Sequence, residues 1–255
     1  TDKARMRQCF KDANVPSPLF TEADAETLKT FKNAHNEAEK SKKSPVLAQI
    51  LKINVDFPMV VKPVDNMGAR GCVTVRNFAE LFAAVEDAIK YSRTGRAIIE
   101  EYMDGPEFSI DSLVLDGKII ITGFAARHIF YPPYFIEMGH TMSSAVTKQQ
   151  RDEVFKVFAQ GVKALGLSKG CAKGDMKLTK KGGMIGEIAA RLSGGYMSGW
   201  TFPYASGVNL TEQAFFIAAG EVPSLFLPEN LAKMEKVAEN VWYFVPENFS
   251  AERAW

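Results

Sequence analysis

Two carboxylates and a turn predict a metal site. Asp175 lies in the strand-like run CAKGDMKLT and Glu187 in GMIGEIAAR, and Lys181-Gly182-Gly183 separates the two runs. A hairpin here places both carboxylates on neighbouring strands. Paired carboxylate oxygens beside phosphates are what Mg²⁺ needs. The alternative is an ordinary Asp and Glu on a sheet face, paired with Lys173 or Arg191.

Arg191 and two glycines follow this hairpin. The guanidinium of Arg191 is permanently charged, and its fork suits an acyl phosphate or a developing oxyanion. Gly194 and Gly195 come next in the chain. We therefore interpret Arg191 as a catalytic residue and the two glycines as part of the substrate site.

Lys62 ends the apolar, β-branched run FPMVVKP, which predicts a strand. The loop DNMGARG follows at 65–71, and its glycines let backbone N–H groups approach an anion closely. A triphosphate could be held by Lys62 with Asn66, Gly68, Arg70 and Gly71. The loop matches neither the P-loop nor the dinucleotide-binding motif, so a plain turn is the alternative.

A further strand, RAIIEEYM, ends in residues suited to a nucleoside. Backbone groups at a strand end can hydrogen-bond a base, and a carboxylate a little further on can hold ribose hydroxyls. The candidates for these contacts are Glu100, Glu101, Tyr102, Met103 and Glu107. The alternative for Glu100 and Glu101 is a solvated strand end.

The segment ARHIFYPPYFIEMGHTMSS, at 126–144, combines aromatic and ionisable residues. We expect an irregular segment with Pro132-Pro133 between two sheets, which is where binding residues often lie. Glu137 and His140 are the substrate candidates, with Arg127 and His128 weaker ones. Alternatively, His140 is a capped loop histidine paired with Glu137, and Tyr131, Tyr134 and Phe135 are core residues.

The elements that must position these residues form an α+β pattern. A helix is predicted at 78–92 behind an Asn77 N-cap, with others at 148–165 and 209–219. Asp116-Gly117 predicts a further hairpin over 107–126. We divide the chain into a helical segment with an exposed charged insertion at 1–54, an αβ lid at 55–104 and an antiparallel core at 105–255. His35 in the insertion is expected at the surface.

The composition excludes several classes of protein. Lys and Arg total 31 against 30 Asp and Glu, a net charge of +1, so nothing predicts binding to nucleic acid or to an anionic membrane. Three scattered cysteines predict neither disulfides nor a zinc site and suit a reducing cytoplasm. We expect no signal peptide and no membrane span. Because the chain opens at Thr1 without Met, we expect a piece of a longer protein.

The ordered series of motifs resembles the ATP-grasp superfamily over most of the chain, including the ATP-binding domains of carbamoyl-phosphate synthase large subunits. Asp2-Lys3 resembles the family's opening, in which the lysine reaches the nucleotide, and FPMVVKP, DNMGARG and IIEEYMDGPEFSID resemble its phosphate, glycine-loop and adenine–ribose segments. EIAARLSGG is similar to its closing motif, with Ala189 where an Asn metal ligand is common. The resemblance implies an ATP-grasp fold with ATP between a lid lobe and an antiparallel-sheet lobe.

The 126–144 segment is similar to the PPYFxExGHxxPS motif of L-amino-acid ligases and carnosine synthases, with Ser143-Ser144 replacing PS. The resemblance implies an enzyme, a cytoplasmic ligase that uses ATP with Mg²⁺ or Mn²⁺ to join a small carboxylate to an amine or ammonia through an acyl phosphate. Alternatives are a carbamoyl-phosphate-synthase-like or glycinamide-ribonucleotide-synthetase-like reaction, or a non-catalytic ATP-binding module. A homodimer is left open. The family's N-terminal α/β domain is expected to be absent.

Overall fold

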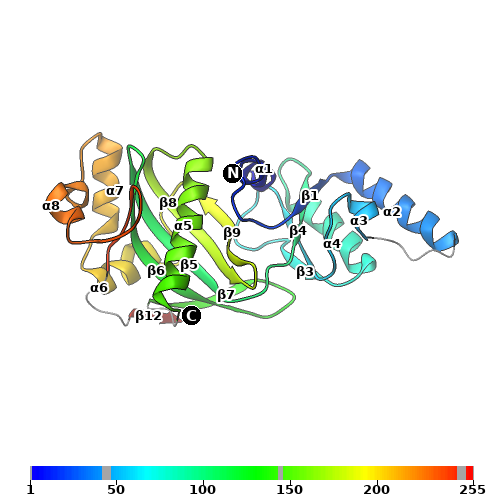
Figure 1. Cartoon of the computed structure of the whole chain (residues 1–255). Coiled ribbons are helices and arrows are strands. Elements are labelled where there is room, and N and C mark those ends of the chain that lie inside the picture. The colour runs from blue at the N-terminus through cyan, green and yellow to red at the C-terminus, as the bar shows by residue number, and fades with distance from the viewer. Residues whose placement is uncertain (1, 42–46, 143–145, 246–250, 255) are drawn as a thin grey trace. The chain divides into compact units, whose positions relative to one another are not determined.

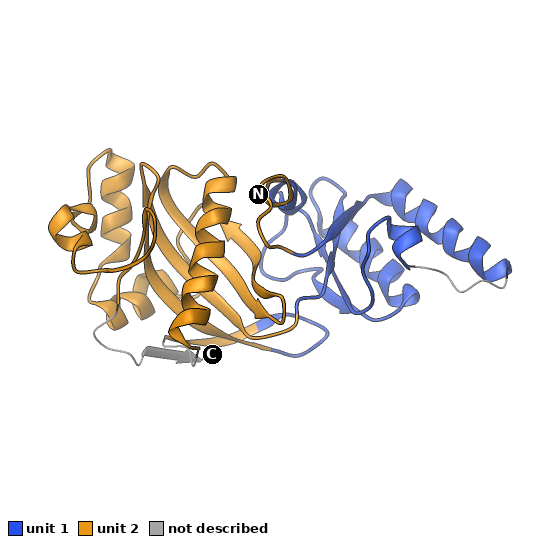
Figure 2. Cartoon of the chain, viewed as in Figure 1, with its two compact units in different colours: residues 1–8, 18–103, 130–136 blue, residues 9–17, 104–129, 137–255 orange. Residues whose placement is uncertain are grey.

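The computed structural model describes residues 2–41, 47–142, 146–245 and 251–254. The chain divides into two compact units, which Figure 2 distinguishes by colour. Unit 1 contains residues 1–8, 18–103 and 130–136, and unit 2 contains residues 9–17, 104–129 and 137–255. Helix α1 (Lys3–Asp12) contributes residues to both units.

Unit 1 is built on a four-stranded antiparallel sheet in the order β1-β4-β2-β3. The strand β2 ends at Pro63, so Lys62 lies in its last residues, as predicted. Figure 1 labels the elements of this unit except β2. Their bounds are β1 (Phe20–Ala23), α2 (Ala25–Lys40), α3 (Leu47–Leu51), β2 (Met59–Pro63), β3 (Val73–Val75), α4 (Phe78–Tyr91) and β4 (Ala97–Glu101).

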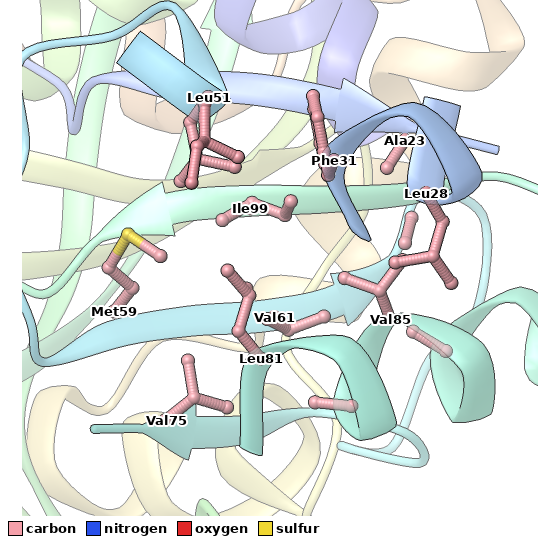
Figure 3. Packing of buried hydrophobic residues seen from close by; sticks show 14 of the residues in the cluster. Ala23, Leu28, Phe31, Leu51, Met59, Val61, Val75, Leu81, Val85 and Ile99 are labelled. Atoms are coloured by element: carbon pink, nitrogen blue, oxygen red, sulfur yellow. The ribbon is translucent and has the colours of Figure 1, made fainter. Parts of the chain in front are cut away.

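The helices of unit 1 bury their apolar residues against this sheet, as Figure 3 shows. Helix α4 begins at the predicted N-cap, where the Asn77 side chain accepts a hydrogen bond from the Glu80 amide. Its Leu81 and Val85 pack with Val61 and Ile99 of the sheet. The apolar face predicted from the sequence is therefore the face that forms the core.

Residues 18–41 and 47–54 belong to the same unit as the expected lid, in contrast to the division expected from the sequence. Strand β1 pairs along β4, and helix α2 buries Leu28 and Phe31 in the core shown in Figure 3. The expectation of a surface His35 is wrong. Its ring centroid lies 4.5 Å from that of Phe78, and its side chain is 15% exposed. The many charged residues of α2 led to the expectation of an exposed helix, although a narrow apolar face is present.

Unit 2 is built on an eight-stranded sheet in the order β10-β11-β6-β5-β8-β9, with β7 pairing to β6 and β12 to β7. Both predicted hairpins are present, one of them turning at Asp116 and Gly117, which have φ of 50° and 79°. The strands are β5 (Glu107–Leu115), β6 (Lys118–Phe130), β7 (Ile136–Met142), β8 (Lys169–Thr179), β9 (Gly182–Ala189), β10 (Glu235–Ala238), β11 (Val241–Tyr243) and β12 (Ala251–Ala254).

Helices cover both faces of this sheet. Helix α5 packs on one face, where Phe155 meets Phe124 edge to face with ring centroids 5.0 Å apart. Phe202 packs on the other face, and a Cβ at Gly123 would lie 2.2 Å from its ring, so only glycine fits there. The bounds are α5 (Lys148–Ala164), the π-helix η1 (Met197–Thr201), α6 (Phe202–Ser206), α7 (Leu210–Ala219), the 3-10 helix η2 (Ser224–Phe226) and α8 (Pro228–Leu231).

The segment at 126–144 is largely strand, which corrects the expectation of an irregular segment. Strand β6 continues to Phe130 and β7 begins at Ile136, so only 131–135 lie between strands. Tyr131 and Tyr134 are 62% and 55% exposed, which excludes the alternative that they are core residues. The Ser143-Ser144 pair lies outside the described residues.

Candidate functional site

In unit 1 the candidate phosphate lysine belongs to a buried charge triad. Lys62 Nζ lies 2.6 Å from Glu100 Oε2, and Arg7 Nε donates to Glu100 Oε1 at 2.6 Å. Glu100 is 2% exposed and Arg7 is fully buried, which excludes the solvated-strand-end alternative for Glu100. The Glu100 carboxylate therefore holds Lys62 in place.

The opposite charges in this triad favour the ionised forms of Lys62 and Glu100. Burial alone would raise the pKa of Glu100, but the charges of Arg7 and Lys62 hold it below its usual value. Burial alone would lower the pKa of Lys62, but the charge of Glu100 raises it. Lys62 is therefore a cation at neutral pH, as a phosphate contact requires.

The predicted glycine-rich loop is anchored at its start. Lys3 Nζ donates to the Asn66 carbonyl at 2.7 Å, and the Asn66 side-chain amide donates to the Tyr91 carbonyl at 2.9 Å. Gly68 has φ of 71° with nothing within 4 Å of where a Cβ would lie. At Gly71 a Cβ would lie 2.9 Å from Tyr91, so packing as well as φ requires this glycine.

The remaining candidates of unit 1 lie in the glycine-rich loop and at the end of β4. Arg70 is exposed and its Nε donates to the Met67 carbonyl at 3.3 Å. The ladder of β4 ends at Glu101, whose amide donates to the Leu19 carbonyl, and Tyr102 and Met103 leave the sheet. Their backbone groups are thus outside the regular ladder, where the sequence predicted contacts to a base.

In unit 2 the two candidate metal ligands lie directly opposite each other. Asp175 on β8 is the register partner of Glu187 on β9, and a β-bulge follows at Asp175/Met176. Burial alone would raise the pKa of Asp175, but Arg127 and Lys173 lower it, so this group is a carboxylate at neutral pH. Within the described residues, Glu187 forms no ion pair. Two anionic oxygen donors on adjacent strands fit a magnesium ion.

Arg127 on β6 connects three carboxylates of unit 2. Its guanidinium contacts Glu107, lies 2.7 Å from Glu137 Oε2 and lies 2.8 Å from Asp175 Oδ1. Burial alone would lower the pKa of Arg127, but these carboxylates raise it. The predicted ribose residue Glu107, substrate residue Glu137 and metal ligand Asp175 therefore form one cluster around Arg127. Asp175 also forms an ion pair with Lys173, as the alternative of an ordinary paired Asp on a sheet face predicted.

Arg191 and the two glycines form an exposed stretch after β9. The Arg191 guanidinium donates to the neighbouring Leu192 carbonyl at 2.9 Å, and Gly194 and Gly195 are exposed. The stretch is attached through Ser193 to Asp111, a fully buried carboxylate of β5. Asp111 was not among the residues predicted from the sequence, because FSIDSLV reads as an ordinary strand.

His140 is a buried strand residue and not a loop histidine. Its Nε2 lies 2.9 Å from Thr201 Oγ1, and its Nδ1 lies 3.9 Å from Glu137 Oε1. His128 Nε2 lies 2.8 Å from Thr141 Oγ1. The predicted Glu137 and His140 are therefore adjacent. Thr201, which comes from a distant part of the chain, was not predicted from any pattern in the sequence.

The two units define a protein with an antiparallel lid-type sheet, a larger mixed sheet, and charged residues gathered on each. The ATP-grasp domain family model matches residues 55–199, which is more than half of the chain. The chain therefore belongs to the ATP-grasp family.

Proteins similar to this chain include several ligases. A D-alanine–D-alanine ligase of Pseudomonas putida is 27% identical over 135 residues, covering 51% of this chain and 34% of that protein. Carnosine synthase 1 of Gallus gallus is 24% identical over 196 residues, covering 72% and 21%. The crystal structure of an L-amino acid ligase from Bacillus licheniformis aligns with a TM-score of 0.66 and 22% identity, covering 84% and 46%.

The chain spans about a third of the length of the first curated relatives that it matches. The similarity to the solved ligase supports the α+β ATP-grasp fold. Among the residues that the structure describes, none of the helices has the length and apolar character needed to cross a bilayer.

Proposed function

We propose that this chain is the nucleotide-binding and catalytic part of a ligase that uses Mg-ATP to join a small carboxylate to an amine or ammonia. The observation that carries the proposal is the register pairing of Asp175 with Glu187, beside the Arg127 cluster and ahead of Arg191. Family membership and the ligases among its relatives support the same reaction class.

In this reaction the substrate carboxylate attacks the γ-phosphorus, the bond to the β-phosphate oxygen breaks, and ADP leaves. The amine then attacks the acyl carbon and loses a proton as phosphate departs. Lys3 and Lys62 bind phosphate oxygens, and Glu100 keeps Lys62 oriented. Asp175 and Glu187 hold Mg²⁺, which neutralises phosphate charge when bound. Arg191 binds the acyl phosphate.

We propose an amino acid or a similar small carboxylate as the substrate. Glu137 and His140 lie next to each other, and Arg127 joins Glu137 to the proposed metal ligand Asp175. A carboxylate such as Glu137 can bind the ammonium group of an amino acid. The sequence similarity to carnosine synthase 1, which covers 72% of this chain, supports this choice.

Isothermal titration with a non-hydrolysable ATP analogue tests the nucleotide site. The parent protein should bind the analogue more tightly with Mg²⁺ than without it, and Lys62→Met should weaken binding about tenfold or more, the cost of a lost charge-assisted contact. Glu187→Gln should remove the Mg²⁺ dependence. The matched control is Lys169→Met, because Lys169 is an exposed lysine of unit 2 paired with Asp116. Equal binding by Lys62→Met and Lys169→Met would contradict the assignment.

ADP release separates the proposed ligase from a module that only binds the nucleotide. Each amino acid is tested with an amine or ammonia, and Glu137→Gln should raise KM for the amino acid without weakening binding of the ATP analogue. ADP release that occurs with bicarbonate and ammonia but with no amino acid would favour the carbamoyl-phosphate-synthase-like alternative.

A further inference from the structure

The buried carboxylate of Asp111 has no role in the function proposed above, yet both of its oxygens are used. Oδ1 accepts hydrogen bonds from the Ser193 amide at 3.0 Å and from Ser193 Oγ at 2.7 Å. Oδ2 accepts a hydrogen bond from Ser198 Oγ. In the described part of the chain, no Lys, Arg or His forms an ion pair with Asp111. All three donors come from one short stretch of chain.

These donors lie at the two ends of an exposed turn. Gly194, Gly195 and Tyr196 are exposed between them, while Ser198 is 3% exposed. Gly195 and Tyr196 both have left-handed backbone conformations, with φ of 59° and 61°. A tyrosine in this region is strained and persists only when its surroundings fix it. The hydrogen bonds to Asp111 fix both ends of the turn.

We propose that Asp111 is the positioning residue of the 191–198 turn, holding Arg191 and the exposed Gly194-Gly195 backbone in the geometry that receives the acyl phosphate. This inference rests on the proposed function, because Arg191 is the residue that it places. Asp111 itself touches no substrate. It acts through Ser193 and Ser198.

A carboxylate suits this position better than an amide. An ionised carboxylate accepts from all three donors, whereas an Asn side chain has a single acceptor oxygen and brings two donors of its own. Burial raises the pKa of Asp111 to about 6, against the lowering effect of the Ser198 and Ser193 hydrogen bonds and of the Lys173 charge. The other titratable neighbour is Cys171, whose pKa burial and Asp111 raise to about 11. The ionised form is therefore retained although its burial is unfavourable.

Amide hydrogen exchange tests the inference directly. Asp111→Asn and the double variant Ser193→Ala/Ser198→Ala should each lower the protection of the 193–198 amides by about tenfold, as expected for the loss of hydrogen bonds to a charged group. Amides of β8 and β9 should be unaffected. The matched control is Ser112→Ala on the same strand, because its hydroxyl is also buried but donates to the Ala172 carbonyl at 2.9 Å.

A double-mutant cycle links the turn to Arg191. If Arg191→Ala weakens binding of the ATP analogue relative to ADP, Asp111→Asn should do the same, and combining the two changes should add nothing further. In the parent, protection of the turn should fall as pH drops through about 6, the pKa of Asp111, and this dependence should be absent from the double serine variant.

The outcomes separate this inference from the proposed function. A parent protein that binds no ATP analogue would overturn the proposed function, while the exchange data would still decide whether Asp111 holds the turn. Normal analogue binding with unchanged protection in both Asp111→Asn and the double serine variant would overturn the inference. If Asp111→Asn does not fold, the double serine variant decides alone.

Discussion

Glu100 and Asp111 are both buried carboxylates on inner strands, one in each unit, but they are neutralised differently. Glu100 lies between Arg7 and Lys62, whereas the donors to Asp111 among the described residues are hydroxyl and amide groups. Accordingly the pKa of Glu100 is lowered and that of Asp111 is raised to about 6. Cations compensate a buried charge, but neutral donors do so only in part. The ionised Glu100 carboxylate therefore stabilises unit 1, whereas burial of the ionised Asp111 carboxylate destabilises unit 2.

Removing the Glu100 charge should have the largest effect on stability. Glu100→Gln removes the carboxylate charge that Arg7 and Lys62 share, and we expect a loss of about 4 kcal/mol in the free energy of unfolding. Urea denaturation at pH 7.5 measures it. Because the folded pKa is below the usual 4.5, the stability from Glu100 is present above that value and is lost as pH falls through the folded pKa. A loss below about 1 kcal/mol, the range of exposed pairs, would contradict the account.

Removing Arg127 tests the cluster of unit 2 in the same way. Arg127→Met leaves Glu107, Glu137 and Asp175 without their shared cation, and we expect a loss of about 3 kcal/mol. The comparison is Arg96→Met, because Arg96 also pairs with two carboxylates but its side chain is 35% exposed. That change should cost about 1 kcal/mol or less. Equal losses of stability in the two variants would show that burial does not increase the contribution of the Arg127 cluster to the free energy of unfolding.

The pH dependence of stability is expected to have the opposite sign at Asp111. The rise of its pKa from 3.8 to about 6 means that stability falls by up to about 3 kcal/mol as pH rises from 4 to 6, since the folded state holds the proton longer. Asp111→Asn should remove this slope and gain about 1 kcal/mol at pH 7.5 after its lost hydrogen bonds are counted. Urea melts across this pH range measure it. An Asp111→Asn variant that is less stable than the parent at pH 7.5, and whose stability still falls as pH rises from 4 to 6, would contradict the difference proposed between Asp111 and Glu100.

The smallest effects are expected at the helix caps. Asn77→Ala in unit 1 and Thr147→Ala in unit 2 each remove a side-chain acceptor from a helix N-terminus, and each should cost about 1 kcal/mol. Thermal melting of both variants measures the difference between the units. Because Thr147 also takes part in a capping box with Gln150, its replacement should cost slightly more.

Local sequence patterns were enough to predict several elements of the fold. The Asp116-Gly117 turn, the Asn77 cap and the apolar face of α4 each depend on residues close in sequence, and the structure confirms all three. The thin apolar face of α2 was interpreted as part of an exposed helix because charged residues surround it, whereas Leu28 and Phe31 are buried. The strands of the 126–144 segment were obscured by Pro132-Pro133, although those prolines occupy only the short connection between β6 and β7.

The strand positions of several candidate residues could be predicted from the sequence, but their contacts could not. The hairpin turn was enough to place Asp175 beside Glu187. By contrast, the pairing of Glu100 with Arg7 and of Asp111 with Ser198 joins residues far apart in the chain. An acidic residue within an apolar strand, as in FSIDSLV, is the one signal that could have identified Asp111, because a buried carboxylate requires partners.

Trapping with hydroxylamine tests the central claim most directly. The full chain is incubated with Mg-ATP, hydroxylamine and each amino acid in turn, and acyl hydroxamate and ADP are measured together. We predict equal amounts of the two products with at least one amino acid, and neither product from Arg191→Ala or Glu187→Gln, while Lys169→Met behaves as the parent. Mg²⁺-dependent binding of the ATP analogue without hydroxamate from any amino acid would contradict the assignment of an amino-acid ligase.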